Sequence, residues 1–206
     1  MTRPRVTVLM PAHNALTYVL AAVESILVQS FADFEFLIID DCSTDGTWGV
    51  LQQCARQDQR IFLHRNPRNM GVVATLNTGV ALARGDYIAR MDADDMSHSE
   101  RLARQVAYLD AHLDVALVAA RVELIGANGE PRGVWDADQR ATTPDTIRRA
   151  LPHGNCIAHP SVMLRRPIAL AYPYRADQRH VEDYDLWLRL CADGHCLAKL
   201  DDVLLK

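Results

Sequence analysis

Short apolar runs and apolar residues at helical spacing alternate along the first half of the chain. Residues 6–10 form an apolar run that Pro11 ends, and apolar residues then recur at helical spacing over residues 16–28. The same succession of strand, polar turn and helix follows three more times. The further strands are expected at residues 35–40, 61–64 and 86–91, and the helices after them extend to Arg56, to Ala83 and over residues 99–111. Strands that alternate with helices predict an α/β protein with a mainly parallel sheet.

The pattern loosens in the second half. Residues 115–119 predict another strand, and residues 122–125 and 133–135, joined by a turn at 126–129, predict a small antiparallel hairpin. A short helix at 145–151, a strand at 159–166 and a helix at 183–191 are also expected. Residues 203–206 are typical of the start of a strand, so we expect a fragment of a longer protein. Because no Pro/Ser-rich linker separates the halves, one shared sheet is expected.

Composition and charge narrow the class. The chain has 206 residues, 49% hydrophobic and 23% charged, which suits one globular domain. A net charge of −4 without a dense basic stretch argues against nucleic acid as a partner. An early polar N-terminus and the lack of an 18-residue apolar run favour a cytoplasmic location. Five cysteines without a C-x-x-C pair suggest neither a disulfide framework nor a zinc ribbon.

Polar or turn-forming groups follow each of the first four expected strands. They are Pro11, Ala12, His13 and Asn14 after the first, Asp40 and Asp41 at the second, Asn69 and Gly71 after the third, and Asp92, Ala93, Asp94 and Asp95 after the fourth. Open α/β sheets bind ligands beyond the carboxyl ends of their strands. These groups are therefore expected around one ligand site.

The run from Asp92 to Asp95 carries three carboxylates, which repel one another unless a cation lies among them. Mg2+ or Mn2+, bound by carboxylates and substrate phosphates, would relieve that repulsion; simple helix capping is the alternative. A phosphatase motif D-x-D-x-T is excluded by Met96, and a nucleotidyltransferase would need a Gly-rich basic loop where residues 11–14 stand. A metal-dependent site for a phosphate-bearing ligand is the hypothesis.

Three other positions could carry chemistry. The loop around Asp41 lacks the acidic twelfth position of a calcium loop, where Gln52 stands, so Asp41 either caps a helix or accepts from a nucleobase. Glu182 and Asp183 begin an expected helix, as a general base or as capping acids. His159 precedes Pro160 and by itself is typical of a structural histidine.

Taken in order, five motifs resemble a family 2 glycosyltransferase. They are Val6 to Asn14, Asp40 to Thr47, Asn69-Met70-Gly71, Asp92-Ala93-Asp94-Asp95 and Glu182-Asp183. The resemblance implies a GT-A fold, a Rossmann-like three-layer sandwich with helices on both faces of the sheet. It also implies transfer of a sugar, with inversion, from a nucleotide sugar, usually a UDP-sugar, to an acceptor hydroxyl.

The resemblance implies a role for each site residue. The donor would contact Pro11, Ala12, His13, Asn14, Asp41, Asn69, Gly71, Asp92, Ala93, Asp94 and Asp95. Asp41 would accept from uracil, and Asp92 would reach the ribose or donor sugar. Asp94, with Asp92, would hold Mg2+ or Mn2+. Asp183 would be the catalytic base, with Glu182 as the alternative, and His159 would lie near the acceptor or donor sugar.

The resemblance also implies a domain organisation, an acceptor class and a location. Residues 1–206 would be a single domain, with residues 1–115 binding the nucleotide sugar and residues 116–206 supplying the acceptor site and the base. The acceptor would be a saccharide or a lipid-linked saccharide of surface polysaccharide, lipopolysaccharide or glycolipid synthesis, at the inner face of the cytoplasmic membrane, with peripheral membrane association left open. The alternatives are a nucleotide-binding module without turnover and another metal-dependent nucleotidyl or phosphate enzyme.

Overall fold

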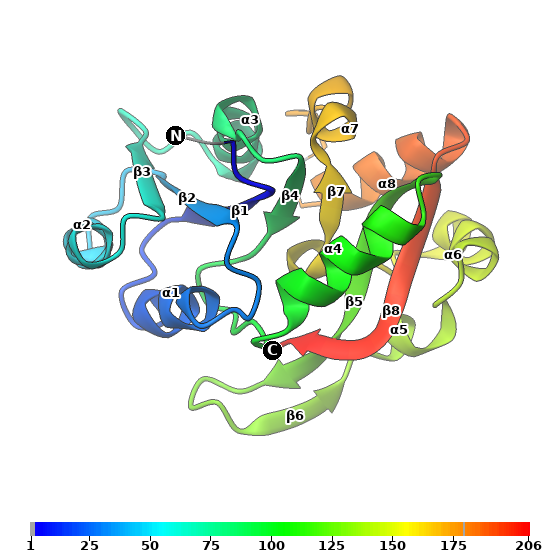
Figure 1. Cartoon of the computed structure of the whole chain (residues 1–206), viewed down its shortest axis with the longest axis horizontal. Helices are drawn as coiled ribbons and strands as arrows, with labels where there is room; N and C mark the ends of the chain where they lie inside the picture. The colour runs from blue at the N-terminus through cyan, green and yellow to red at the C-terminus, as the bar shows by residue number, and fades with distance from the viewer. Residues whose placement is uncertain (1–2, 179) are drawn as a thin grey trace.

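An eight-stranded sheet forms the middle layer of the molecule (Figure 1). The computed structural model describes residues 3–178 and 180–206. The strands are β1 Val6–Ala12, β2 Phe34–Asp40, β3 Ile61–Arg65, β4 Tyr87–Arg90, β5 Val115–Ile125, β6 Pro131–Val134, β7 Met163–Arg165 and β8 Cys196–Leu205. Their order is β3-β2-β1-β4-β7-β5-β6, and β8 pairs with β5. Pairing is parallel except around β7, which is antiparallel to β4 and β5, and at β6.

Helices cover both faces of this sheet because successive strand residues point to opposite sides. Val8 and Met10 of β1 pack in one core with α1 Val19–Leu27, α2 Thr47–Gln57 and α4 Arg101–Ala111. Leu9 packs in the other. That second core includes α3 Val72–Leu82, α6 Pro144–Ala150, α7 Arg166–Ala171 and α8 Glu182–Ala192. The α/β three-layer sandwich that the sequence predicted is confirmed.

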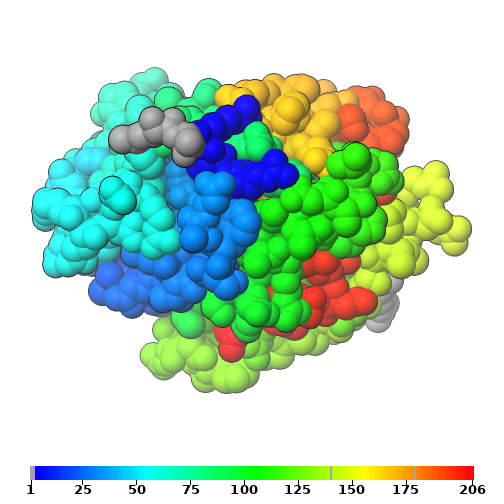
Figure 2. Space-filling view, viewed as in Figure 1, coloured from blue at the N-terminus to red at the C-terminus, as the bar shows by residue number. Residues whose placement is uncertain are grey.

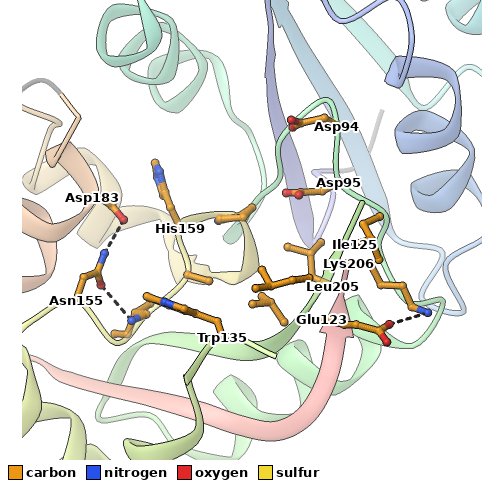
Figure 3. Close-up of a pocket in the computed structure, with 15 residues that line it drawn as sticks. Asp94, Asp95, Glu123, Ile125, Trp135, Asn155, His159, Asp183, Leu205 and Lys206 are labelled. Carbon is orange, nitrogen blue, oxygen red and sulfur yellow. Dashed lines mark hydrogen bonds and ion pairs between the residues drawn. The ribbon is translucent and has the colours of Figure 1, made fainter. Parts of the chain in front are cut away.

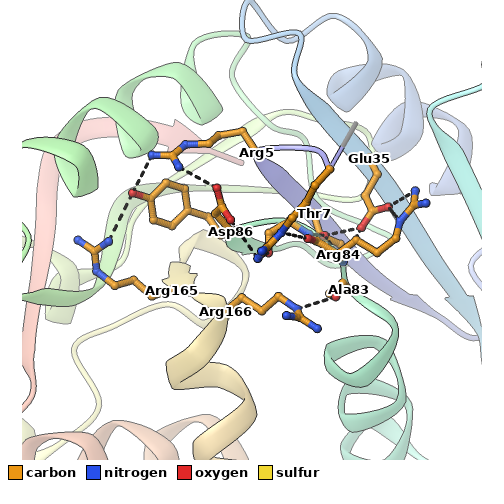
Figure 4. A network of polar contacts seen from close by, with 11 residues as sticks. Arg5, Thr7, Glu35, Ala83, Arg84, Asp86, Arg165 and Arg166 are labelled. Carbon is orange, nitrogen blue, oxygen red and sulfur yellow. Dashed lines mark hydrogen bonds and ion pairs between the residues drawn. The ribbon is translucent and has the colours of Figure 1, made fainter. Parts of the chain in front are cut away.

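A polar network ties the strands together near their amino ends (Figure 4). Thr7 donates to the buried carboxylate of Glu35 at 2.6 Å, and Arg84 donates to the same carboxylate from its backbone N–H at 2.8 Å and from Nε at 2.6 Å. Arg5 pairs with Asp86 at 2.8 Å nearby. These charges therefore support the edge of the sheet opposite to the one that carries the predicted site.

Several predicted elements differ from the observed ones. The strand expected at 159–166 is present but shorter. Residues His159–Ser161 form a 3-10 turn around Pro160, which has no N–H for a ladder, and β7 begins only at Met163. The two expected strands at 115–119 and 122–125 are one strand, β5. The short helices α7 and α5 (Asp136–Arg140) were not predicted. Helices of five or six residues are too short to display an apolar period.

The second half of the chain inserts a strand beside the first half. β7 lies between β4 and β5, so the sheet continues across both halves. In the space-filling view, red residues of β8, from the second half, lie against the green residues of α4, from the first half (Figure 2). Within the described residues, no helix has the length and apolar character that a membrane span requires.

Candidate active site

The carboxyl ends of β1, β2 and β4 surround a small pocket of about 150 Å3. Its lining consists of Pro11, Ala12, His13, Asp41, Val72, Thr75 and Asp92. These residues follow three strands and open one helix, and parallel strands end at the same edge of the sheet. The structure thus brings together five residues that the sequence placed at the nucleotide.

Asp41 is the most firmly held group of this pocket. Its Oδ1 accepts from Asn66 Nδ2 at 2.7 Å and from the Met70 N–H at 2.8 Å, and its Oδ2 accepts from the Gly71 N–H at 2.8 Å. Burial favours the neutral acid, but these hydrogen bonds outweigh burial and hold the pKa of Asp41 below its ordinary value. Of the two carboxylate oxygens, Oδ1 accepts two of these bonds and Oδ2 accepts one, so Oδ2 is the less heavily engaged.

His13 closes another side of the pocket with a defined tautomer. Its Nε2 lies 3.0 Å from Asn69 Nδ2 and 3.2 Å from Asn14 Nδ2, both of which can only donate. Its Nδ1 lies 2.8 Å from the carbonyl oxygen of Asp41, which can only accept. The neutral ring with the proton on Nδ1 fits these contacts, with the two amides sharing the single lone pair of Nε2. Asn14 and Asn69 therefore orient His13 in this structure.

The loop after β4 concentrates charge. Arg90 is buried and donates from Nη1 to Asp92 Oδ2, and Asp94 is exposed. Burial, followed by the negative charges of Asp92 and Asp94, raises the pKa of Asp95 to about 7, although Arg90 opposes the shift. Bringing a cation to these oxygens would relieve the repulsion.

The residues present fit a hard divalent cation that takes much of its shell from elsewhere. Among residues 3–178 and 180–206, no group of three or more His, Cys, Asp or Glu is arranged to hold a metal ion. One oxygen of Asp92 is engaged by Arg90, while Asp94 is exposed. Mg2+ and Mn2+ suit one or two carboxylates, with water and phosphate oxygens completing the shell.

A larger cavity of about 480 Å3 joins the two halves of the chain (Figure 3). It is lined by Asp94, Asp95, Val122, Glu123, Leu124, Ile125, Trp135, Asn155, Ile157, Ala158, His159, Pro160, Asp183, Leu205 and Lys206. Asp94 and Asp183 face it from different sides. The structure therefore brings the predicted metal-binding loop, His159 and the predicted base to one space.

Asp183 lies in the first turn of α8 and is partly buried. Burial raises the pKa of its carboxyl, and the charge of Glu182 adds to the rise, while hydrogen bonds from the Tyr184 N–H and from Asn155 oppose it. A raised pKa makes a carboxylate a stronger proton acceptor. Glu182 is buried beside it, does not line the cavity, and has an Oε2 without a hydrogen-bond partner among the described residues.

His159 enters the cavity as a neutral group. Its Nε2 lies 2.9 Å from the Tyr174 hydroxyl, and its ring meets Trp187 edge-on with 6.0 Å between ring centroids. Burial, together with the positive charge of Arg90, holds the pKa of His159 well below its ordinary value. The side chain can exchange hydrogen bonds with a ligand but does not supply a positive charge.

Sequence reasoning missed three contributors. Arg90 is a charged residue inside a buried strand directly before Asp92, and that position is a usable signal. Asn155 and Trp135 line the cavity from irregular segments, where no periodicity marks a residue. Their roles depend on the path of the chain between elements.

Comparisons with known proteins identify the class. Residues 7–170 match the family described as Glycosyl transferase family 2. EpsE of Bacillus subtilis (strain 168), named as a glycosyltransferase, is 35% identical over 210 residues, covering 98% of this chain and 72% of that protein. The Escherichia coli UDP-Glc:alpha-D-GlcNAc-diphosphoundecaprenol beta-1,3-glucosyltransferase WfgD is 31% identical over 195 residues, covering 94% and 72%.

Solved structures share the fold. TarS of S. aureus, in complex with UDP, superposes with a TM-score of 0.80 at 21% identity, covering 98% of this chain and 59% of that one. The mannosyltransferase PcManGT from Pyrobaculum calidifontis, in complex with GDP-Man and Mn2+, gives a TM-score of 0.77 at 21% identity, covering 100% and 57%. This chain thus spans about three fifths of these solved proteins.

The chain belongs to glycosyl transferase family 2 and has the GT-A fold. It is a glycosyltransferase, as the sequence motifs predicted.

Proposed function

We propose that this enzyme transfers a sugar from a UDP-sugar to an acceptor hydroxyl with inversion at the anomeric carbon, assisted by Mg2+ or Mn2+. The observation that carries the proposal is the cavity shared by Asp94, Asp95 and Asp183. Inversion requires a base on one side of the sugar and stabilisation of the leaving group on the other. Acidic side chains on different sides of one cavity suit that division.

Donor binding begins in the small pocket. Asp41 Oδ2, the less engaged carboxylate oxygen, accepts an N–H of the uracil ring, while His13 and Pro11 form walls of the pocket. Three further residues support the lining of that pocket. The amides of Asn14 and Asn69 orient His13, and the Gly71 N–H donates to Asp41. The donor then extends past Asp92 and Ala93 toward the larger cavity.

The diphosphate meets the loop after β4. Asp94 and Asp92 would hold the divalent ion, and Asp95 would support that ion or the donor sugar. When bound, the ion stabilises the negative charge that develops on the departing diphosphate.

Asp183 performs the proton transfer. Its carboxylate accepts the proton of the acceptor hydroxyl as that oxygen bonds to the anomeric carbon, and the bond from that carbon to the diphosphate oxygen breaks. Glu182 is less suited, because it does not line the cavity. His159, which is neutral, donates or accepts a hydrogen bond at the sugar.

The acceptor is proposed to be a saccharide or lipid-linked saccharide of cell-surface polysaccharide synthesis. The name of WfgD, a glucosyltransferase acting on a diphosphoundecaprenol-linked sugar, supports this class. Such an acceptor would place the enzyme at the inner face of the cytoplasmic membrane.

Product analysis with UDP-sugars tests the proposal. Wild type is incubated with Mn2+, a panel of UDP-sugars and lipid-linked saccharides, and NMR reads the anomeric configuration of the product.

Asp183→Asn should lower kcat by about 10^2-fold or more while leaving UDP affinity within about twofold, since base catalysis acts in the transition state. Asp94→Ala should remove the Mn2+ dependence of UDP binding measured by calorimetry.

The alternatives give different products. Release of pyrophosphate or phosphate in place of UDP would identify another phosphate enzyme, and tight UDP binding without any transfer would identify a binding module. Normal turnover by Asp183→Asn would show that Asp183 is not the catalytic base.

A further inference from the structure

Asn155 contacts Asp183 from outside α8. Its Nδ2 donates to Asp183 Oδ2 at 2.9 Å, across 28 positions of sequence (Figure 3). Both residues line the larger cavity. The contact therefore lies beside the space in which a hydroxyl would approach Asp183.

The amide of Asn155 is fixed at both ends. Its Oδ1 accepts from the backbone N–H of Ile157 at 3.1 Å, while its Nδ2 faces Asp183. A flipped amide would point N–H at N–H and oxygen at carboxylate, losing both bonds. The orientation that donates to Asp183 is therefore the one the loop selects.

A buried ion pair holds the same loop. Lys199 Nζ donates to the carbonyl oxygen of Cys156, the residue after Asn155, at 2.6 Å, and pairs with Asp138 at 2.7 Å. The side chains of Lys199 and Asp138 are fully buried. Asp138 also accepts from the Val122 N–H of β5 at 2.8 Å. Burying two charges costs free energy. The ion pair joins α5, β8 and the loop that carries Asn155.

We propose that Asn155 is a positioning residue that holds the Asp183 carboxylate in one rotamer and stabilises its ionised form. The inference rests on the proposed function, in which Asp183 is the base.

The surroundings of Asp183 make this contact consequential. Glu182 beside it is acidic. Across the cavity stand the acidic Asp94 and Asp95, the neutral His159, and Lys206, whose charge is paired with Glu123 at 2.9 Å. The buried hydroxyl of Tyr174 is uncharged at neutral pH. The donors that favour the ionised carboxylate are the backbone N–H groups of Tyr184 and Asp183 and the side chain of Asn155. Removing one of them should raise the pKa of Asp183.

Titration of Asp183 by NMR tests this without a donor or acceptor. The full chain is labelled with 13C-carboxyl aspartate, and Asp183→Asn assigns the resonance. Asn155→Ala should raise the measured pKa by about one unit, since the variant loses a hydrogen bond to the charged form that water replaces only in part. Asn155→Asp, which keeps the shape and the Ile157 bond, should raise it further because it adds a like charge.

Asn128→Ala is the matched control, because Asn128 lies exposed in the turn before β6. It should leave the titration unchanged. An unshifted pKa in both Asn155→Ala and Asn155→Asp would overturn the inference.

Kinetics then separates positioning from binding. With the UDP-sugar that the donor screen selects, Asn155→Ala should lower kcat about tenfold at pH 7, leave the donor KM within about twofold, and move the acid limb of the pH profile upward. If Asp183→Asn is inactive while Asn155→Ala keeps the wild-type kcat and pH profile, the inference fails and the proposed function stands. If Asp183→Asn turns over normally, the proposed base fails.

Discussion

Some residues at the edge of the sheet both stabilise the fold and line the candidate site. Asp41 accepts three hydrogen bonds that fix the turn before α3, and the same carboxylate faces the small pocket. Gly71, at a φ of 82°, lets the backbone N–H reach that carboxylate. A site residue can therefore be tested by stability as well as by binding.

Asp41→Asn is expected to lower the free energy of unfolding by about 1–3 kcal/mol at pH 7, because a carboxamide N–H would face a backbone N–H. The pKa of Asp41 is depressed in the folded state, so its ionised form stabilises the protein above the unfolded pKa, and that contribution is lost as pH falls through the folded pKa. The Tm gap between wild type and variant should shrink from pH 7 toward pH 3.

Asp33→Asn is the control for this series, since Asp33 is exposed. It should leave Tm nearly unchanged at every pH. A gap for Asp41→Asn that is equal at pH 7 and pH 3 would mean that the charge of Asp41 contributes nothing.

At the scale of elements, segments with a clear apolar period were predictable. Short helices were not, and neither was the ten-residue strand β8, which was expected only at residues 203–206 and in fact ends there. The first four strands and their helices appear with ends within a few residues of those expected, because apolar spacing marks a face that must be buried. α1 begins at Val19, later than expected, since the backbone N–H groups of Ala15 and Leu16 donate to Thr47, the first residue of α2, and to Asp45 in the turn before it. Such long-range anchoring leaves no local pattern.

Two glycines on different helices make a matched test of packing. A Cβ at Gly79 of α3 would lie 2.2 Å from Leu9 Cδ1 in the buried sheet, whereas a Cβ at Gly49 of α2 meets nothing within 4 Å. Overpacking costs about 1–3 kcal/mol and exceeds the helix-propensity gain of about 1 kcal/mol, so Gly79→Ala should destabilise. Gly49→Ala should stabilise by about 0.5–1 kcal/mol.

Chemical denaturation of the two variants measures both effects. A Gly79→Ala variant as stable as wild type would show that Leu9 can move aside.

At the scale of the whole molecule, the second half completes both the sheet and the site. β7 lies between β4 and β5, and the larger cavity takes its lining from both halves. The buried pair of Lys199 and Asp138 joins β8 to α5 and to the loop at Cys156. The shape of the cavity therefore depends on contacts among segments far apart in sequence.

Lys199→Met is expected to lower the free energy of unfolding by about 3–5 kcal/mol, because it leaves Asp138 charged, buried and unpaired. The double variant with Asp138→Asn should recover much of the loss, since no unpaired charge remains and the amide oxygen can still accept from the Val122 N–H. Urea unfolding measures both. A double variant no more stable than the single one would contradict a charge-based explanation.

The sequence alone determined the class of fold, the family and the edge of the sheet where chemistry was expected. Periodicity, strand-end residues such as Asp41 and Asp94, and the order of the motifs are local properties of the chain. Tertiary structure alone decided that Asp183 and His159 share a cavity with Asp94 and Asp95. It also decided that Asn155 bonds to Asp183 and that Lys199 is buried with Asp138. These contacts join segments that are connected by irregular loops. They depend on how helices pack on the two faces of the sheet, and no local sequence pattern encodes that packing.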